Sequence, residues 1–405
     1  MSKEKKNNKN KEITNELPEY ITAREYSLCS AAERENWRAV PKKYERIPLF
    51  SKICFGISAV SLVIYILAVF SESFADFFNS NISTVFRFTL AKISNILPFS
   101  IGEFLFILLV PAAVGYIVFA IKCRSQTWKM VASSLSVPVS IVCIILSLFV
   151  LNLGTGYRTP TLDKKLNYEE VKVNSQNLYD SALYLIQNIN ALSEELEYDG
   201  ENFSEMPYSF KEMNEKLLDA YDKFCEKNDI IKTFDSNLKP VLMSKPMSYM
   251  HTLGIYTFFT GEANINMDFP DYTIPYTSAH ELAHQRGIAR EDEANMIAFL
   301  VCMESDDAYI RYSAYLNMYE YTANALYNTD KELYAKAREQ LHYKVKSEQT
   351  AYNNFFSQYY DSGASKISST VNDTFLKIQG TQGEVSYSLV VKLAVAYFKT
   401  QNFIE

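Results

Sequence analysis

Histidine and cysteine are both scarce in this chain, with 4 and 6 residues among 405. The cysteines show no regular spacing, which excludes a disulfide framework of the kind that staples small secreted domains. Cys225 and Cys302 are the two in the C-terminal half; they could pair, but separated cysteines more often serve as small buried apolar residues. No apolar run follows the first lysines, which argues against a cleaved signal peptide.

An excess of positive charge is also lacking, because the net charge is −7. The balance is uneven: residues 1–152 hold 17 basic and 11 acidic side chains, whereas residues 153–405 hold 23 and 36. The acidic C-terminal part argues against nucleic-acid binding and against electrostatic docking on an anionic membrane surface. We therefore expect no nucleic-acid partner.

Three long runs carry no charged side chain: Ile53–Ser71, Phe104–Ile121 and Met130–Tyr157. Each is long enough to cross a bilayer, and membrane helices tolerate the prolines inside two of them. The sequence thus predicts a polar tail over residues 1–51, a membrane domain with three transmembrane helices over residues 52–152, and a separate domain over residues 153–405. Between the first two runs, apolar residues recur at helical spacing from Ile82 to Leu97, which predicts an amphipathic helix.

Basic residues set the expected orientation of these spans. They precede the first span and fill the connection between the second and third, whereas the other connection balances two basic residues with two acids. By the positive-inside rule the N-terminus is cytoplasmic, and three spans then place residues 153–405 outside. We expect a multi-pass protein of the cytoplasmic membrane with the lipid bilayer as one partner.

The C-terminal domain is predicted to be mainly helical. Helical patterns cover residues 173–196, 208–226, 307–327, 331–350 and 385–398. Between them, Ile255–Phe259 is rich in aromatic and β-branched residues, and Ala263–Phe269 alternates apolar and polar residues as a half-buried strand does. The expected fold class is therefore mainly α, with three transmembrane helices followed by an α+β domain that holds a small antiparallel sheet.

The motif that indicates chemistry is His280-Glu281-Leu282-Ala283-His284. On a helix His280 and His284 lie one turn apart and can reach one metal ion, while Glu281 can take a proton from a metal-bound water. A catalytic zinc, Zn²⁺, usually has three protein ligands and an open position. Ser278-x-x-Glu281 also fits a capping box, which would give Glu281 a structural role instead.

The third ligand is expected just beyond the helix. Gly287 can end the helix and let the chain return, and Glu291 and Glu293 start the next apolar helix. These two glutamates lie about 200° apart on a helix, so only one can face the metal. We favour Glu291, with Glu293 as the alternative ligand, because Asn295 lies one turn on from Glu291 and can orient a ligating histidine. Tyr312 and Tyr387 are candidate donors to an oxyanion.

Several stretches of the chain match a family pattern: Met247–Tyr249, Gly254–Tyr256, Thr260–Asn264, His280–Asn295, Val371–Asp373 and Ser386–Tyr387. With these the chain, over about Lys52 to Phe398, resembles a bacterial membrane-protein family known as domain of unknown function 3810. That resemblance implies a zincin-like, zinc-metalloprotease-like domain without a defined substrate.

More distantly, Glu291–Asn295 is similar to the Glu-x-x-Ala-Asp segment of zinc peptidases of the gluzincin type, with Asn295 in place of Asp. The position that would hold the third histidine of metzincins is Arg290, which cannot ligate. In zinc peptidases an edge strand binds the substrate backbone, and the resemblance implies Ala263–Phe269 for that part.

Two functions follow from these patterns. The favoured one is a membrane-anchored, zinc-dependent metallopeptidase-like hydrolase of the bacterial cell envelope, in which Glu281 activates a zinc-bound water toward a peptide bond of a peptide or protein substrate. The alternative is a non-enzymatic envelope binding or scaffold protein with a structural or vestigial zinc site, which would have four protein ligands.

Overall fold

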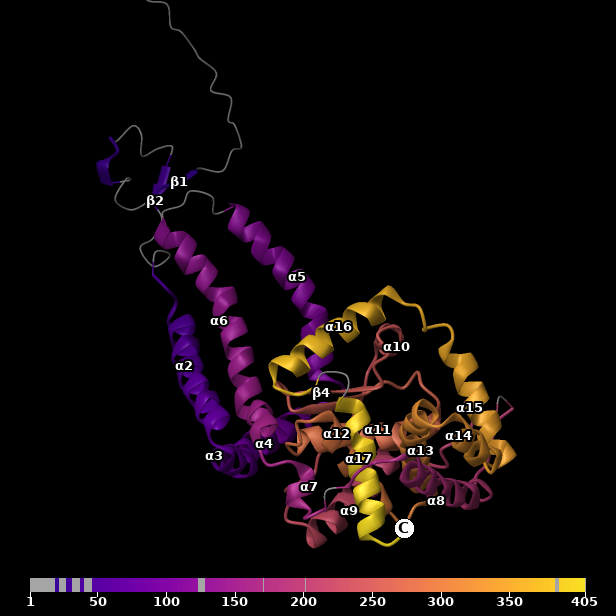
Figure 1. Cartoon of the computed structure of the whole chain (residues 1–405). Coiled ribbons are helices and arrows are strands. Elements are labelled where there is room, and N and C mark those ends of the chain that lie inside the picture. The colour runs from indigo at the N-terminus through magenta and orange to yellow at the C-terminus, as the bar shows by residue number, and fades with distance from the viewer. Residues whose placement is uncertain are drawn as a thin grey trace, which may run out of the picture. The chain divides into compact units, whose positions relative to one another are not determined.

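The computed structural model describes residues 19–21, 27–30, 37–39, 46–122, 128–169, 171–200, 202–382 and 386–404. The chain divides into two compact units, which are Met1–Ile57 with Leu109–Ile144, and Ser58–Leu108 with Ile145–Glu405. The first unit includes a short parallel pairing of β1 (Glu19–Ile21) with β2 (Trp37–Ala39). The second holds the C-terminal domain together with the adjoining ends of the apolar helices (Figure 1).

Three helices are long and apolar enough to cross a membrane: α2 (Leu49–Phe70), α5 (Ile101–Lys122) and α6 (Trp128–Asn152). Most of their large apolar side chains are exposed, as expected for helices that face lipid. The prediction of three membrane helices is thus confirmed. The third helix ends earlier than its apolar run, because the chain turns at Leu153 into a short 3₁₀ segment, Gly154–Arg158.

The connection between α2 and α5 is helical, as its apolar spacing predicts, but it is broken into pieces. It consists of α3 (Glu72–Phe77), a π-helical segment (Phe78–Ser83) and α4 (Thr84–Ser94). On α4, Arg87 is only 1% exposed, and burial lowers its pKa to about 10. Its guanidinium donates to the backbone carbonyls of Asn79 and Asn152, so a buried charge holds this connection against the end of α6.

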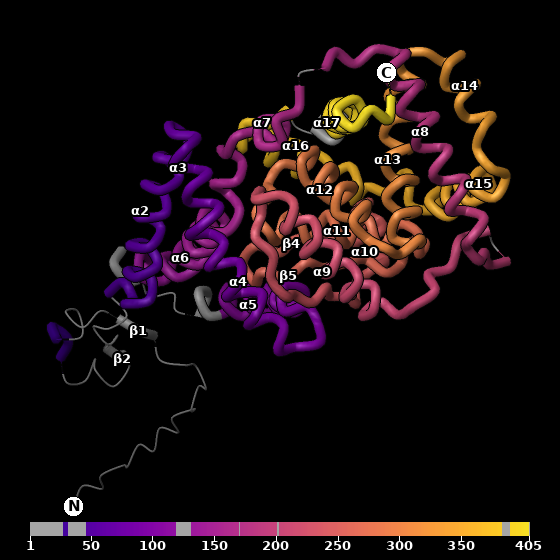
Figure 2. Tube along the Cα trace, turned by 90° about the horizontal axis from the view of Figure 1, so that it is seen from below, coloured from indigo at the N-terminus to yellow at the C-terminus, as the bar shows by residue number. Residues whose placement is uncertain are grey.

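The C-terminal domain surrounds the motif helix with other helices (Figures 1 and 2). The motif helix is α11 (Ile274–Gln285). The helices around it are α8 (Ser175–Ser193), α9 (Phe210–Lys227), α12 (Glu291–Met303), α13 (Ala308–Thr329) and α17 (Ser386–Thr400). Their apolar faces meet in one continuous core, in which α11 and α12 are almost completely buried. Cys302 is buried within that core and does not pair with Cys225.

The helix predicted over residues 331–350 is two helices, α14 (Lys331–Glu339) and α15 (Tyr343–Phe356). The break comes from a tertiary contact, because Asn190 on α8 bonds to the backbone on both sides of it. Its amide donates to the carbonyl of Gln340, and its side-chain oxygen accepts from the N–H of His342. A further helix, α16 (Gly363–Ile378), was not predicted.

The sheet has three strands in the order β3-β5-β4, which are β3 (Lys239–Pro240), β4 (Gly254–Thr257) and β5 (Glu262–Ile265). The expectation of a purely antiparallel sheet is wrong, since β3 pairs with β5 in parallel and β4 pairs with β5 antiparallel. The expectation that β5 is half-buried is also wrong: all four of its residues are buried. Its polar residues have partners, for Glu262 in the first turn of α5 and for Asn264 in β4, which a period-2 pattern cannot reveal.

Glu262 on β5 caps the first turn of α5. Its two carboxylate oxygens accept from the backbone N–H groups of Ile101 and Gly102 at 2.9 and 2.8 Å. In the reverse direction, Glu103 in the first turn of α5 accepts from the N–H groups of Leu242 and Met243. The sheet and the start of a membrane helix are thus joined by four hydrogen bonds to carboxylates.

We predict that Glu262→Gln destabilises the solubilised protein. The glutamine amide keeps one oxygen acceptor and turns an N–H₂ group toward the second backbone N–H, which loses its partner. A buried donor left unpaired costs about 1–3 kcal/mol, and the negative charge at the helix start is lost as well. Thermal unfolding in detergent should show a lower Tm. Glu332→Gln, at an exposed position in the first turn of α14, is the matched control and should leave the Tm unchanged; equal Tm values for both variants would contradict the capping role.

Candidate metal centre

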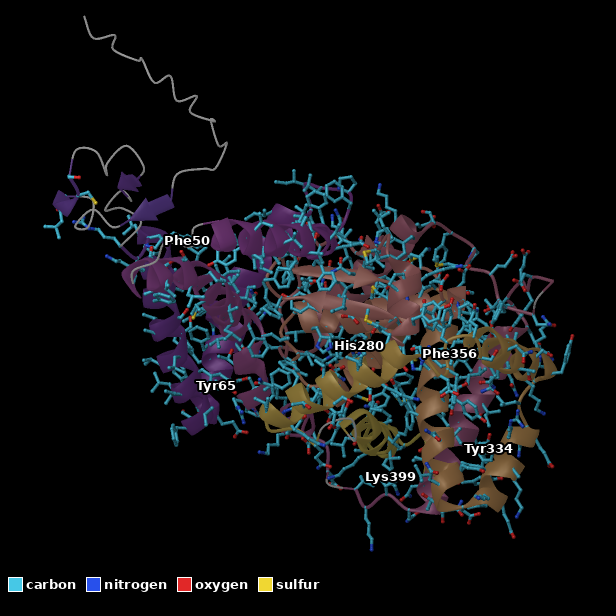
Figure 3. The ribbon with its side chains drawn as sticks, turned by 90° about the horizontal axis from the view of Figure 1, so that it is seen from above. Phe50, Tyr65, His280, Tyr334, Phe356 and Lys399 are labelled. Carbon is cyan, nitrogen blue, oxygen red and sulfur yellow. The ribbon has the colours of Figure 1, made fainter. Side chains whose placement is uncertain are left out.

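The two histidines of the motif lie on one face of α11, as the helical spacing predicts. Their ring centroids are 4.6 Å apart with the ring planes nearly perpendicular. Nδ1 of His284 hydrogen-bonds to the carbonyl of Ile288 at 2.7 Å, which leaves Nε2 as the atom that can bind a metal. His280 lies among the side chains in the middle of the C-terminal domain (Figure 3).

Gly287 lets the chain turn back after α11. Its φ of +98° is in the region that favours glycine, and a Cβ there would lie 2.5 Å from the guanidinium of Arg87. Asn79 also donates to the Gly287 carbonyl at 3.0 Å. The turn is therefore shaped by glycine and enclosed by the connection between α2 and α5. It lets α12 start at Glu291 beside the histidines.

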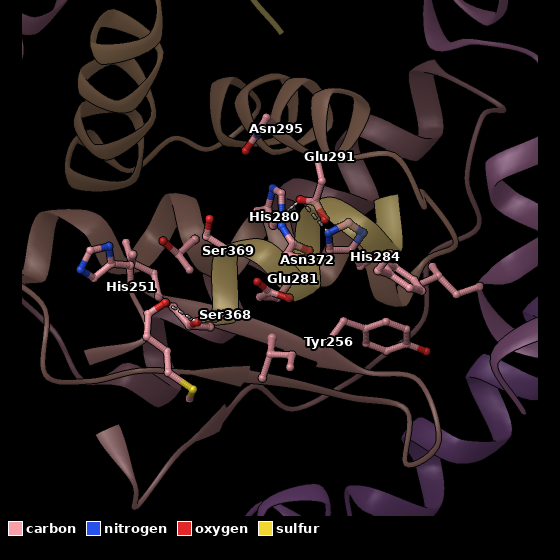
Figure 4. Close-up of a pocket in the computed structure, with 18 of the residues that line it drawn as sticks. His251, Tyr256, His280, Glu281, His284, Glu291, Asn295, Ser368, Ser369 and Asn372 are labelled. Atoms are coloured by element: carbon pink, nitrogen blue, oxygen red, sulfur yellow. Dashed lines mark hydrogen bonds and ion pairs between the residues drawn. The ribbon is translucent and has the colours of Figure 1, made fainter. Parts of the chain in front are cut away.

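Glu291 lies between the two imidazole rings (Figure 4). Its Oε2 is 3.3 Å from Nε2 of His280 and 3.5 Å from Nε2 of His284. The metal-binding atoms of these three residues all lie within 4.8 Å of one another, and they form the one such cluster of three among the described residues. Two imidazoles from α11 and one carboxylate from the first turn of α12 fit the ligand set of a catalytic zinc.

The three groups are strongly coupled. Burial raises the pKa of Glu291, but the charges of the two histidines outweigh it and hold this pKa well below its usual range. Burial alone would lower the pKa of His284, but the Glu291 carboxylate raises it to about 9. The Glu291 carboxylate therefore faces the Nε2 atoms of both histidines. A cation bound among these three groups would displace the protons from the ring nitrogens.

Glu281 lies on the other side of the histidines, between α11 and the sheet (Figure 4). Its side chain is 5% exposed, its Oε2 has no hydrogen-bond partner, and the backbone N–H of Tyr256 bonds to the carboxylate. Burial raises its pKa, while the neighbouring histidines lower it. A Cβ on Gly254 would lie 2.7 Å from this side chain, so the absence of a side chain there lets β4 approach the carboxylate.

The capping-box alternative for Ser278 does not describe this helix. α11 begins at Ile274, so Ser278 is in its interior, and its hydroxyl is buried without a hydrogen-bond partner. Glu281 consequently has no cap to complete. One oxygen of its buried carboxylate, Oε2, has no hydrogen-bond donor among the described residues.

The other candidate residues of the motif region face elsewhere. Glu293 is turned away from the histidines and accepts from the N–H of Leu162 and from Arg290, each at 3.0 Å. Asn295 does line the cavity, but its side-chain oxygen accepts from the hydroxyls of Tyr276 and Tyr321 rather than from a histidine.

Neither predicted oxyanion donor is placed in the site by the structure. Tyr312 is buried beside α15, where its hydroxyl donates to Glu348, and it does not line the cavity. Tyr387 is in α17, but its side chain lies outside the described residues. On the same helix, Tyr321 does line the cavity; it lies about two and a half turns further on, on the opposite face from Tyr312.

A cavity of about 880 Å³ opens over the cluster. One wall is formed by the metal-binding side chains and β4. Another is apolar and comes from the end of α6 and its surroundings: Phe149, Leu153, Tyr157, Phe258 and Phe375. The third is polar and comes from α16: Ser365, Ser368, Ser369 and Asn372. Apolar walls with a few convergent polar groups are typical of a ligand site.

Residues 74–395 match the family described as "Protein of unknown function (DUF3810)". The chain belongs to this family. The matched region covers about four fifths of the chain and includes every residue that lines the cavity. No curated protein and no solved structure matches the chain.

The family match begins within α3 and so includes α5 and α6 but not α2. It also includes α16, whose wall residues the sequence patterns did not single out as part of the site. The signal for them was present, because Asn372 belongs to the matched stretch Val371-Asn372-Asp373. Nothing in helical spacing alone indicates that this helix covers a site more than 80 residues earlier in the chain.

Proposed function

We propose that this protein is a membrane-anchored zinc metallopeptidase. The observation that supports it most is Glu281, whose buried and partly unsatisfied carboxylate stands beside three ligand-type side chains inside a cavity. A site that only stored or displayed a metal would have no use for a free buried base at that place. The cost of burying it indicates a chemical role.

His280, His284 and Glu291 are the residues that would hold zinc. When bound at such a site, zinc lowers the pKa of a water molecule to about 7 and polarises a carbonyl group. The residues of the chain do the rest. Glu281 accepts the proton of the attacking water at its free Oε2 and can later pass it to the leaving amine. Tyr321, on the cavity wall, replaces Tyr312 as the candidate donor to the carbonyl oxygen.

The outer edge of β4 is the proposed binding strand for the substrate backbone. The resemblance implied Ala263–Phe269, but β5 is the central strand, so its edges are already paired. On β4, the carbonyls of Leu253 and Thr257 accept from the β5 side, and so Gly254 and Tyr256 between them direct their backbone groups to the opposite side. Glu281 already accepts from the Tyr256 N–H on that side, so an extended peptide could add there as a further strand through Gly254 and the Tyr256 carbonyl.

The rival proposal is a structural zinc site in a scaffold protein. Such a site is closed by four protein ligands. Among the described residues the cluster has three, and the adjoining space is a cavity rather than a fourth side chain. This difference favours the enzyme.

The direct test is metal analysis of the purified full-length protein combined with a peptide-library cleavage assay. We expect one zinc per chain and cleavage that a chelator abolishes and added zinc restores. Stoichiometric zinc without cleavage of any library member would instead support the scaffold function.

We also propose that the C-terminal domain is extracytoplasmic, because of the lysine and arginine bias across the three membrane helices. A reporter that is active only outside the cytoplasm, fused after Glu405, should be active in cells. The same fusion with a reporter active only in the cytoplasm should be silent, and the reverse result would overturn the orientation.

A further inference from the structure

The helix α16 has three distinct faces. At about 100° per residue, its buried and cavity-facing residues lie on one side. A second side carries four large apolar side chains, which are Ile367, Val371, Phe375 and Ile378 with exposed fractions of 69%, 64%, 36% and 69%. The third side is polar, with Lys366, Thr370 and Lys377. On a helix surrounded by water, a continuous exposed apolar stripe beside a polar face is unfavourable and indicates a surface that something covers.

The C-terminal end of α16 contacts the membrane helices. The ring of Phe375 is 5.6 Å from that of Phe149 on α6, and the hydroxyl of Tyr65 on α2 donates to Gln379 at 3.2 Å. At 1.5 Å per residue, Phe149 is about 4.5 Å and Tyr65 about 7.5 Å inside the ends of their helices. Residues that contact Phe149 and Tyr65 therefore lie at the depth at which a membrane helix leaves the hydrocarbon core, and not farther out in the water.

Other exposed apolar residues lie near the same level. Leu242, which is 83% exposed, donates its N–H to Glu103 in the first turn of α5. Ile255, which is 50% exposed, belongs to the edge strand β4 and lines the cavity together with Met250. Exposed apolar side chains thus occur both in the cavity lining, at Met250 and Ile255, and beside the start of α5, at Leu242.

We propose that α16 is a membrane-interface helix whose apolar stripe is buried in the leaflet on the side of the C-terminal domain, so that the cavity beneath it opens at the lipid surface. The contacts with Tyr65 and Phe149 support lipid as the occupant of the stripe, because they place its end beside two helices that are long and apolar enough to cross a membrane. The net acidity of the domain argues against electrostatic docking, but burial of apolar side chains needs no positive surface.

The position of α16 also indicates a substrate class for the proposed peptidase. This step rests on the proposed function. A backbone that adds to β4 must pass between the sheet and α16, next to the bilayer. The substrate class is therefore a peptide segment close to a membrane anchor, such as the extended chain that adjoins a transmembrane helix of another protein.

The first experiment measures the contact with lipid. Trp37 and Trp128 are the two tryptophans of the chain; both are replaced by Phe, and single tryptophans are introduced by Ile367→Trp or Val371→Trp. The controls on the polar face are Lys366→Trp and Thr370→Trp. The full-length chain is reconstituted in phosphatidylethanolamine and phosphatidylglycerol vesicles that contain phospholipid brominated in the acyl chains.

We expect the bromolipid to quench the fluorescence at positions 367 and 371 more strongly than at 366 and 370, and aqueous acrylamide to show the reverse order. Equal quenching by acrylamide at all four positions would overturn the proposal, since the stripe would then face water. Protection of 367 and 371 from both quenchers would also overturn it, because a protein partner would cover the stripe.

The second experiment tests the substrate class in the same vesicles. One peptide sequence that the enzyme cleaves is supplied either free or attached to a transmembrane anchor. We expect the anchored form to be cleaved faster, and Val371→Glu to remove that preference while cleavage of the free peptide is unchanged. Equal rates for both forms would overturn the substrate class alone. Absence of cleavage of either form would count against the peptidase function, while the quenching result still decides the position of α16.

Discussion

Replacement of Glu281 by glutamine should leave the protein folded and loaded with zinc, while peptide cleavage falls by about 10²–10⁴-fold. Glutamine has nearly the same shape but cannot accept the proton of the attacking water. The backbone N–H of Tyr256 retains an oxygen acceptor, so β4 should keep its place. The expected change is therefore in kcat, with little change in KM. Steady-state kinetics and metal analysis of the same preparation check it.

The matched control is Glu281→Asp, which keeps the carboxylate but shortens its reach. It should retain more activity than the glutamine variant, because a proton acceptor remains. Unchanged cleavage by Glu281→Gln would contradict the role of this residue as base. Unfolding of that variant would show instead that the carboxylate supports the packing of α11 against β4.

The second large effect is expected at Glu291. Glu291→Gln should weaken zinc binding by at least about 100-fold, the upper range for loss of residues that merely support ligands. Glu293→Gln is a stringent control, because it makes the same chemical change two residues away on the same helix. Its carboxylate bonds to Leu162 and Arg290, so its loss should lower stability but leave zinc affinity within a fewfold of the parent.

Competition titration with a chromophoric chelator measures both affinities, and thermal unfolding separates a loss of fold from a loss of metal. If Glu293→Gln released the metal and Glu291→Gln kept it, Glu293 would be the third ligand in place of Glu291. That outcome would mean that metal binding rearranges the first turn of α12.

Features with a local physical cause could be predicted from the sequence. The placement of His280 and His284 on one face follows from the pitch of a helix, and the turn at Gly287 follows from the one residue type that adopts its φ without strain. The membrane helices follow from run length alone. The angle between Glu291 and Glu293 indicated that only one of them can face the metal, and the structure brings the Glu291 carboxylate toward the histidines. The reason for preferring Glu291, a contact of Asn295 with a histidine, is not met, because Asn295 accepts from two tyrosines.

Features with a distant cause could not be predicted. Asn190 breaks the helix predicted over residues 331–350, although it lies about 150 residues earlier. The alternation in β5 suggested a strand with one face exposed to solvent, but Glu262 bonds to the first turn of α5 and Asn264 to Thr257 on β4. Tyr312 and Tyr321 lie about 180° apart on α13, and only the packing of that helix decides which of the two faces reaches the cavity.

The carboxylate of Glu262 gives the sheet a mechanical connection to the bilayer. It holds the first turn of α5 to β5, and β5 carries the edge strand β4 that faces Glu281. A helix that adjusts to a thicker or thinner bilayer shifts along the membrane normal or tilts, at a cost of fractions of a kcal/mol per Å of mismatch. Any such shift of α5 loads the two hydrogen bonds to Glu262 directly. If the proposed function holds, bilayer thickness would therefore act on the spacing between the edge strand β4 and Glu281.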